Sequence, residues 1–181
     1  MARVPEITSR DQVQPEKRHI FDEIVESRGR VAGPFATLIN SPEVAGRAAH
    51  LGSYLRFEST LSAVELELAT ITASREFNCD YEWGAHVRMG REAGVREEAI
   101  DAVGNNGSLD ALTEDEALIV GYGRELLRQN KVSDTTFEAA KARFGVQGIM
   151  DLTVTMGYYG MLAVAMNAFE VEPPADWPRL P

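Results

Sequence analysis

The fold is decided by residues 62–94, which read SAVELELATITASREFNCDYEWGAHVRMGREAG. Ser62 and Glu65 open this stretch with a capping-box pattern, in which the hydroxyl and the carboxylate accept hydrogen bonds from the free amides at a helix start. Apolar residues then recur every three to four positions, as on the buried face of an amphipathic helix. We therefore predict one helix that ends near Phe77 and a second that ends at Gly94.

The same signals recur on both sides of this stretch and predict a chain built from helices. Helix-start residues such as Pro15, Ser41 and Thr113 precede apolar residues at helical spacing. No alternating, strand-like pattern persists anywhere in the sequence. We therefore expect an all-α fold, a multi-helix bundle of about eight helices. Besides the two above, the expected helices cover residues 15–28, 41–57, 96–103, 113–129, 133–145 and 147–169.

Length and composition indicate one soluble domain. The chain has 181 residues, of which 44% are hydrophobic and 25% are charged, as in ordinary globular proteins. No linker or repeat divides it, so we expect a single domain over residues 1–181. Within it, residues 1–14 are expected to form an irregular N-terminal arm, and the Pro-rich tail at residues 171–181 is not expected to be helical.

Charge and cysteine content narrow the possible partners and the location. The formal net charge is -10 and the pI is about 4.8, which argues against nucleic acid and anionic membranes as partners because both attract basic surfaces. The lone cysteine, Cys79, cannot form an intrachain disulfide, and no signal peptide is evident, so we expect a cytoplasmic protein. The weakly polar stretch 149–169 contains Asp151 and is interpreted as a buried core helix instead of a membrane span.

Four polar residues interrupt the apolar faces of the two helices within residues 62–94. Glu67 stands in the apolar stripe of the first helix, and a helical wheel places Cys79, Glu82 and His86 on the inward face of the second. The connecting loop is short, so the helices are expected to pack antiparallel and bring Glu67 to the other three. Burying an unpaired carboxylate or imidazolium is costly, which means that these groups need partners or a function.

The chemistry of such a cluster is that of a proton relay. We expect Cys79 to be the first residue of its helix, where free amides and the helix dipole favour the thiolate. His86 would take up or release a proton at neutral pH. Two carboxylates that lie close together disfavour double ionisation, so either Glu67 or Glu82 is expected to hold a proton at pH 7.

Structural interpretations of the same residues stay open. A lone cysteine on a buried face is typical of packing, and a buried histidine is typically hydrogen-bonded within the core. Glu82 and His86 are four residues apart and would form an ordinary intrahelical pair. The four residues would also suit a metal ion, although no ligand-pair motif supports one. The coincidence of four polar residues on two apolar stripes favours a functional site.

The Met and Tyr residues near the C-terminus are assigned to the core or a subunit contact: Met150, Met156, Met161, Met166, Tyr158 and Tyr159.

The region around the cluster resembles the carboxymuconolactone decarboxylase family, which includes the alkylhydroperoxidase D-like proteins. The resemblance rests on Glu67-Leu68-Ala69, the run from Asn78 to Trp83, His86, and the run from Arg91 to Val95. It is strongest over residues 61–103. It implies an AhpD-like, all-helical fold that assembles as homo-oligomers, often trimers or hexamers.

The peroxidase branch of that family carries a Glu twelve residues before the first Cys of a Cys-x-x-Cys motif, and a His four residues after the second. Glu67, Cys79 and His86 match these three positions, but Glu82 stands at the second Cys position. Tyr81 occupies a position that is often His in that branch. Without a second thiol, the resemblance implies at most a one-Cys hydroperoxidase that needs an external thiol to resolve its sulfenic acid.

The decarboxylase branch is similar in its His and acidic residues and relies on no Cys pair. Its reaction removes a carboxylate from a lactone during the breakdown of aromatic compounds. The leading hypothesis is therefore a cofactor-free, metal-free lyase in which His86 is the general acid/base and Glu67 and Glu82 orient it or relay protons. Cys79 would be an auxiliary proton donor or nucleophile. Tyr81 and Trp83 would shape a pocket for a small carboxylated or lactone-type substrate.

The lactone is a polyanion, yet no cationic clamp is obvious, because Arg88 is predicted to point away and Arg75 is only a candidate. Another subunit would have to supply one. The alternatives to a lyase are a one-Cys alkylhydroperoxidase with peroxiredoxin-type antioxidant activity and a non-catalytic oligomeric binding protein. The partners expected in each case are a small molecule and further copies of the chain, without nucleic acid or membrane.

Overall fold

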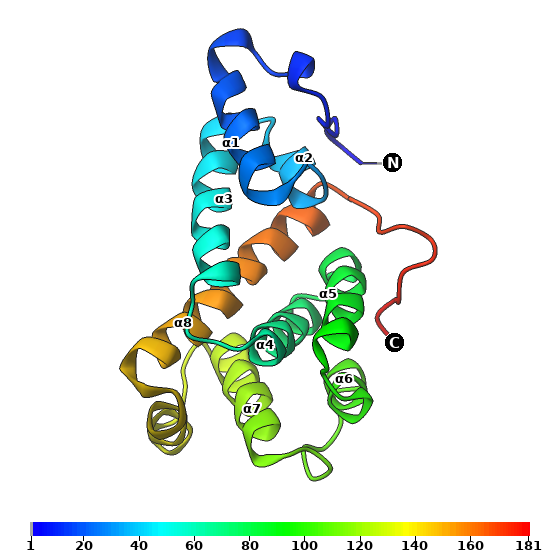
Figure 1. Ribbon diagram of the computed structural model, residues 1–181. Coiled ribbons are helices and arrows are strands. Elements are labelled where there is room, and N and C mark those ends of the chain that lie inside the picture. The colour runs from blue at the N-terminus through cyan, green and yellow to red at the C-terminus, as the bar shows by residue number, and fades with distance from the viewer. Residues whose placement is uncertain (1) are drawn as a thin grey trace. The chain divides into compact units, whose positions relative to one another are not determined.

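The computed structural model describes residues 2–181, and within this range the chain is helical and contains no strand (Figure 1). Met1, the first residue of the predicted arm, lies outside the described residues. The all-α prediction is therefore confirmed. In chain order the elements are the 3-10 helices η1 (Arg10–Gln12) and η2 (Pro15–Lys17), then α1 (Arg18–Arg28), α2 (Pro34–Leu38), α3 (Pro42–Phe57), α4 (Ala63–Glu76), α5 (Asp80–Ala93), α6 (Glu97–Gly104), α7 (Glu114–Gln129) and α8 (Asp134–Ala168).

Two compact units group these elements. Of the described residues, the first consists of residues 2–58 and Ala165–Glu172, and the second of Ser59–Val164 and Pro173–Pro181. The expectation of a single domain over the whole chain stays a prediction. In the first unit, α3 packs against α1 and α2. The N-terminal arm is irregular apart from η1, and backbone hydrogen bonds from Arg3 to Phe169 and from Ile7 to Ala36 hold it in place.

Helix α4 is the centre of the second unit and packs against α5, α6 and α7 (Figure 1). Every residue from Leu66 to Ser74 is buried, as expected for a helix with neighbours on all sides. Its hydroxyl groups need internal partners for that reason. Thr70, Thr72 and Ser74 each donate to the backbone carbonyl four residues earlier, at 2.8–2.9 Å. The polar side chains of α4 are thus part of its packing.

The boundaries of α4 and α5 follow the sequence signals with one correction. The capping box forms: the amide of Ser62 donates to Glu65 at 2.7 Å, and the amide of Glu65 donates to the Ser62 hydroxyl at 3.3 Å. The N-cap of α5 is Cys79, which therefore precedes the helix instead of being its first residue as predicted. Asn78 has a φ of 48°, a left-handed conformation that is incompatible with the extended geometry of an N-cap.

The C-terminal region contains the two predicted helices, which Gly145 separates within α8 by a break at φ 70° and ψ 179°. Helix α8 is long and apolar enough to cross a membrane, but 61% of its most apolar window is buried inside the protein. This burial is typical of a core helix. The tail residues Pro173–Pro181 lie along α5, where the amide of Leu180 donates to Asp80 at 2.9 Å.

Gly123 of α7 lies against two fully buried side chains, Thr72 of α4 and Met156 of α8. A substitution at this glycine therefore tests the packing of the helices. A Cβ atom at this position would lie 2.8 Å from Thr72 of α4 and 2.9 Å from Met156 of α8. We expect Gly123→Ala to lower the free energy of unfolding by about 1–3 kcal/mol, because Thr72 and Met156 are fully buried and would have to shift within a close-packed core.

Gly121→Ala is the matched control on the same helix. Its Cβ would meet only Leu109, at an ordinary distance of 3.8 Å, so it should leave stability unchanged or raise it by up to about 1 kcal/mol through helix propensity. Urea unfolding of both variants checks this. Equal losses at the two positions would contradict the packing described for α4.

Candidate functional site

The buried polar cluster lies between α4 and α5, the two helices that the sequence places side by side. Glu67 projects from α4, whereas Glu82 and His86 lie one turn apart on α5. All three side chains are buried, with exposed fractions of 4%, 2% and 4%. The structure therefore brings together Glu67, Glu82 and His86 as the helical wheel predicts, and it places Cys79 at the N-cap of the same helix.

The imidazole of His86 lies between the two carboxylates. Its Nδ1 is 2.6 Å from Oε2 of Glu67, a hydrogen bond that joins the two helices. Its Nε2 faces Oε2 of Glu82 at a looser 3.4 Å. The ring of Tyr159, from α8, meets the imidazole edge-on with a centroid distance of 4.6 Å. These contacts fix the orientation of the imidazole, so each of its nitrogens is assigned to one carboxylate.

Two opposing effects set the protonation of His86. Burial disfavours the imidazolium, whereas the hydrogen bonds to Glu67 and Glu82 and the charges of those carboxylates favour it. The balance raises the pKa of His86 above its ordinary value of 6.5. A raised pKa means that the folded state binds this proton more tightly than the unfolded state does. The stabilisation is therefore fully present below about pH 6.5 and is lost as the pH rises through the folded-state pKa.

One oxygen of the cluster is left unsatisfied. Oε1 of Glu82 is buried and has no hydrogen-bond partner among residues 2–181. Buried polar atoms in native proteins are nearly always paired, because an unpaired acceptor forfeits its hydration without compensation. A hydrogen-bond donor from a ligand would satisfy this oxygen. The cluster thus has an internal acceptor available beside the imidazole.

The pKa of the Cys79 thiol is shifted in the opposite direction from the one predicted from the sequence. The thiol is completely buried, and this burial raises its pKa to about 11, although the backbone amides of Glu82 and Tyr81 act in the opposite direction. The negative charges of Glu82 and Asp80 raise it further. The prediction that the helix start would favour the thiolate is therefore wrong for this site. Desolvation outweighs the helix amides, and the thiol is protonated at neutral pH.

The two aromatic residues predicted to shape a pocket make other contacts. Tyr81 meets Trp177 of the tail edge-on at a centroid distance of 5.4 Å. Trp83 is buried against Gly104, where an added Cβ would lie 3.0 Å from the indole. Their role in a substrate pocket stays a prediction. The aromatic ring on His86 belongs to Tyr159, which the sequence assigns only to the core or a subunit contact because nothing in its surroundings points to α5.

The two arginines that the sequence offers near the cluster, Arg88 and Arg75, both lie away from His86. The Arg88 guanidinium lies over the ring of Trp177 at 5.3 Å, away from the cluster as predicted. Arg75 is eight residues after Glu67 on α4, which is about 12 Å along the helix axis. Neither arginine therefore forms a clamp beside His86. Within residues 2–181, no three His, Cys, Asp or Glu side chains are arranged to hold a metal ion.

Comparison with known proteins gives a family match over part of the chain and a shared fold over nearly all of it. Residues 42–125 match the carboxymuconolactone decarboxylase family. No curated protein matched the chain. An alkylhydroperoxidase AhpD core structure, an uncharacterized peroxidase-related protein from Ralstonia eutropha, is 18% identical with a TM-score of 0.77, covering 97% of this chain and 93% of that one.

Two further structures share the fold. An Agrobacterium tumefaciens protein of unknown function, for which a role as the antioxidant defence protein AhpD has been suggested, is 22% identical with a TM-score of 0.69, covering 77% of this chain and 96% of that one. A debrominase is 15% identical with a TM-score of 0.68, and the match covers 93% of this chain and 92% of the debrominase. The segment 42–125 therefore matches the carboxymuconolactone decarboxylase family, and the chain as a whole shares the all-α fold of these AhpD-like structures.

Proposed function

We propose that this chain is a cofactor-free lyase of the carboxymuconolactone decarboxylase type, which acts on a small carboxylated or lactone-type intermediate of aromatic-compound catabolism. Members of the superfamily are generally enzymes. The observation that supports the proposal best is the buried His86, held at 2.6 Å by Glu67 and with a raised pKa. Such an imidazolium is suited to deliver a proton near neutral pH.

In the proposed reaction the bond between a ring carbon and its carboxylate breaks, and CO₂ leaves. The electron pair of that bond is delocalised into the lactone carbonyl. His86 then transfers its proton to the carbon, and Glu67 keeps the imidazole oriented and stabilises its charged form. A proton from solvent restores His86. Oε1 of Glu82, which lacks a partner among residues 2–181, would accept a hydrogen bond from the substrate.

The assembly and location are part of the same proposal. Glu67 and Glu82 carry negative charge beside His86, and the nearby arginines do not offset it, so an anionic substrate needs a cation from elsewhere. We propose that the protein works in the cytoplasm as a homo-oligomer, a trimer or hexamer, in which another subunit supplies that cation. Neither nucleic acid nor a membrane is proposed as a partner.

His86→Gln tests the acid/base role. We expect it to lower turnover of a carboxylated lactone by roughly 10²- to 10⁴-fold, because glutamine keeps a hydrogen-bonding side chain but cannot transfer the proton. Glu67→Gln should cause a smaller loss, because the imidazole stays in place without its anionic partner. His50→Gln, at an exposed histidine, is the control and should be fully active. Release of CO₂ measures the reaction, and unchanged turnover in His86→Gln would remove His86 from this role.

A one-Cys hydroperoxidase is the second candidate, because two of the similar structures are connected with AhpD. Its chemistry needs an accessible thiolate at Cys79. With a pKa of about 11, roughly one thiol in ten thousand is ionised at pH 7. The buried, protonated thiol therefore favours the lyase over the hydroperoxidase.

Alkylation of the single cysteine separates the two candidates. We expect iodoacetamide to modify Cys79 slowly at pH 7 in the native protein and rapidly in concentrated urea, which removes the burial. Consumption of a hydroperoxide with dithiothreitol should be the same for wild type and Cys79→Ser. Fast alkylation of the native protein at pH 6, together with hydroperoxide turnover that Cys79→Ser abolishes, would establish the hydroperoxidase instead.

A further inference from the structure

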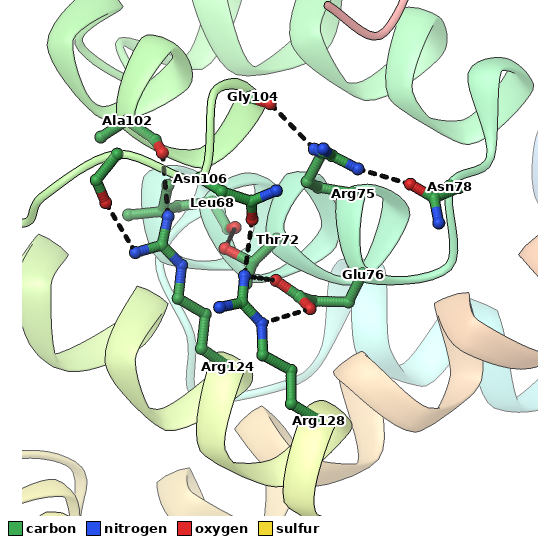
Figure 2. A network of polar contacts seen from close by, with 11 residues as sticks. Leu68, Thr72, Arg75, Glu76, Asn78, Ala102, Gly104, Asn106, Arg124 and Arg128 are labelled. Atoms are coloured by element: carbon green, nitrogen blue, oxygen red, sulfur yellow. Dashed lines mark hydrogen bonds and ion pairs between the residues drawn. The ribbon is translucent and has the colours of Figure 1, made fainter.

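A basic pocket lies outside the Glu67/Glu82/His86 cluster and within the second compact unit. It has a volume of about 470 Å³ and is lined by Arg75, Glu76, Asn78, Asn106 and Arg128. These residues come from the end of α4, the turn after it, the turn after α6 and the last part of α7 (Figure 2). A concentration of arginines is unusual for a chain with a formal net charge of -10.

Internal hydrogen bonds hold the two lining arginines in place. Arg75 donates from Nε to the carbonyl of Gly104 at 2.8 Å and from Nη1 to Oδ1 of Asn78. Arg128 makes a two-pronged ion pair with Glu76 at 2.6–2.7 Å and also donates from Nη2 to Asn106. Their guanidinium planes are therefore fixed before any ligand arrives.

A third arginine adds positive charge beside the pocket, and among residues 2–181 it hydrogen-bonds to backbone carbonyls and to no carboxylate. Arg124, one turn before Arg128 on α7, donates to the carbonyls of Gly107 and Ala102 at 2.9 Å (Figure 2). Burial lowers the pKa of Arg124, and the positive charges of Arg128 and Arg75 lower it further, whereas the carboxylate of Glu76 acts in the opposite direction. Three guanidinium groups are thus gathered around one carboxylate, that of Glu76.

The pocket retains hydrogen-bond donors that the fold does not use. Among residues 2–181, Nη2 of Arg75 and Nη1 of Arg128 have no partner. Because arginine only donates, the oxygens of Asn78 and Asn106 must face it, and their amide nitrogens are left as further donors. The helix dipole favours cations such as Arg75 and Arg128 at the C-terminal ends of α4 and α7. It does not account for the four side-chain groups that still have hydrogen-bond donors to offer.

We propose that this pocket binds a small dianionic ligand, through a phosphate group or a pair of carboxylates. Rigid guanidinium groups match the geometry of both oxyanions, and charge-assisted hydrogen bonds to them are stronger than neutral ones. Two negative charges on the ligand balance the two positive charges that Glu76 leaves unneutralised. The site is independent of the lyase activity, because none of its residues belongs to the Glu67/Glu82/His86 cluster.

Calorimetric titration of the full chain with inorganic phosphate, at constant ionic strength, tests the proposal. We expect saturable binding that weakens at least ten-fold in Arg128→Gln. Arg143→Gln is the matched control, because Arg143 has the same exposed side-chain fraction of 43% and is also paired with a partly buried carboxylate, that of Glu65. It should bind phosphate like wild type.

Asn106→Asp tests the same pocket in a second variant, in case Arg128→Gln does not fold correctly. Aspartate keeps the acceptor for Arg128 and tolerates the left-handed φ of 52°, but it adds a negative charge to the lining. We expect it to abolish phosphate binding in a folded protein. A parallel titration with succinate shows whether the pocket prefers a phosphate or a dicarboxylate. The proposal is overturned if neither anion binds saturably, or if Arg143→Gln loses as much affinity as Arg128→Gln.

Discussion

The hydrogen bond between Glu67 and His86 joins the central helix of the second unit to its neighbour, and the site is organised around it. Helix α4 is buried from Leu66 to Ser74, so any ionisable group on it must find a partner inside the protein. Glu67 finds that partner in His86 at 2.6 Å. Removing one member of such a buried pair typically costs about 3–5 kcal/mol, because the other charge is left uncompensated. The proposed chemistry and the packing of the core therefore depend on the same contact.

This contact also explains the division of roles among the remaining polar groups. His86 keeps its proton because two carboxylates face it, whereas Cys79 keeps its proton because burial excludes water from the thiol. Proton donation, and not nucleophilic attack, is the chemistry that such an arrangement favours. Structures with a similar fold include a debrominase and a peroxidase-related protein, so the proposed reaction rests on the residues of the cluster and not on the fold.

The sequence predicts the elements that follow local rules and misses those that depend on tertiary contacts. The capping box at Ser62 and the wheel of α5 lead to the correct helices and to the correct juxtaposition of the three ionisable residues. Helix α2 (Pro34–Leu38) is missed because five residues are too few for a periodic pattern. The pKa of Cys79 is set by burial, which the spacing of residues does not reveal. The ring of Tyr159 and the pocket around Arg128 bring together segments that are distant in the chain, so neither has a sequence signature.

The most direct test of the account is a measurement of the charge on His86 by ¹⁵N NMR of its imidazole as a function of pH. The exposed His19 and His50 provide reference signals within the same protein. If Glu67 and Glu82 hold the ring as an imidazolium, His86 should titrate above pH 6.5, and Glu67→Gln should move that titration to lower pH. A neutral His86 ring throughout pH 6–8, unchanged by Glu67→Gln, would contradict the proposal that this histidine is the proton donor.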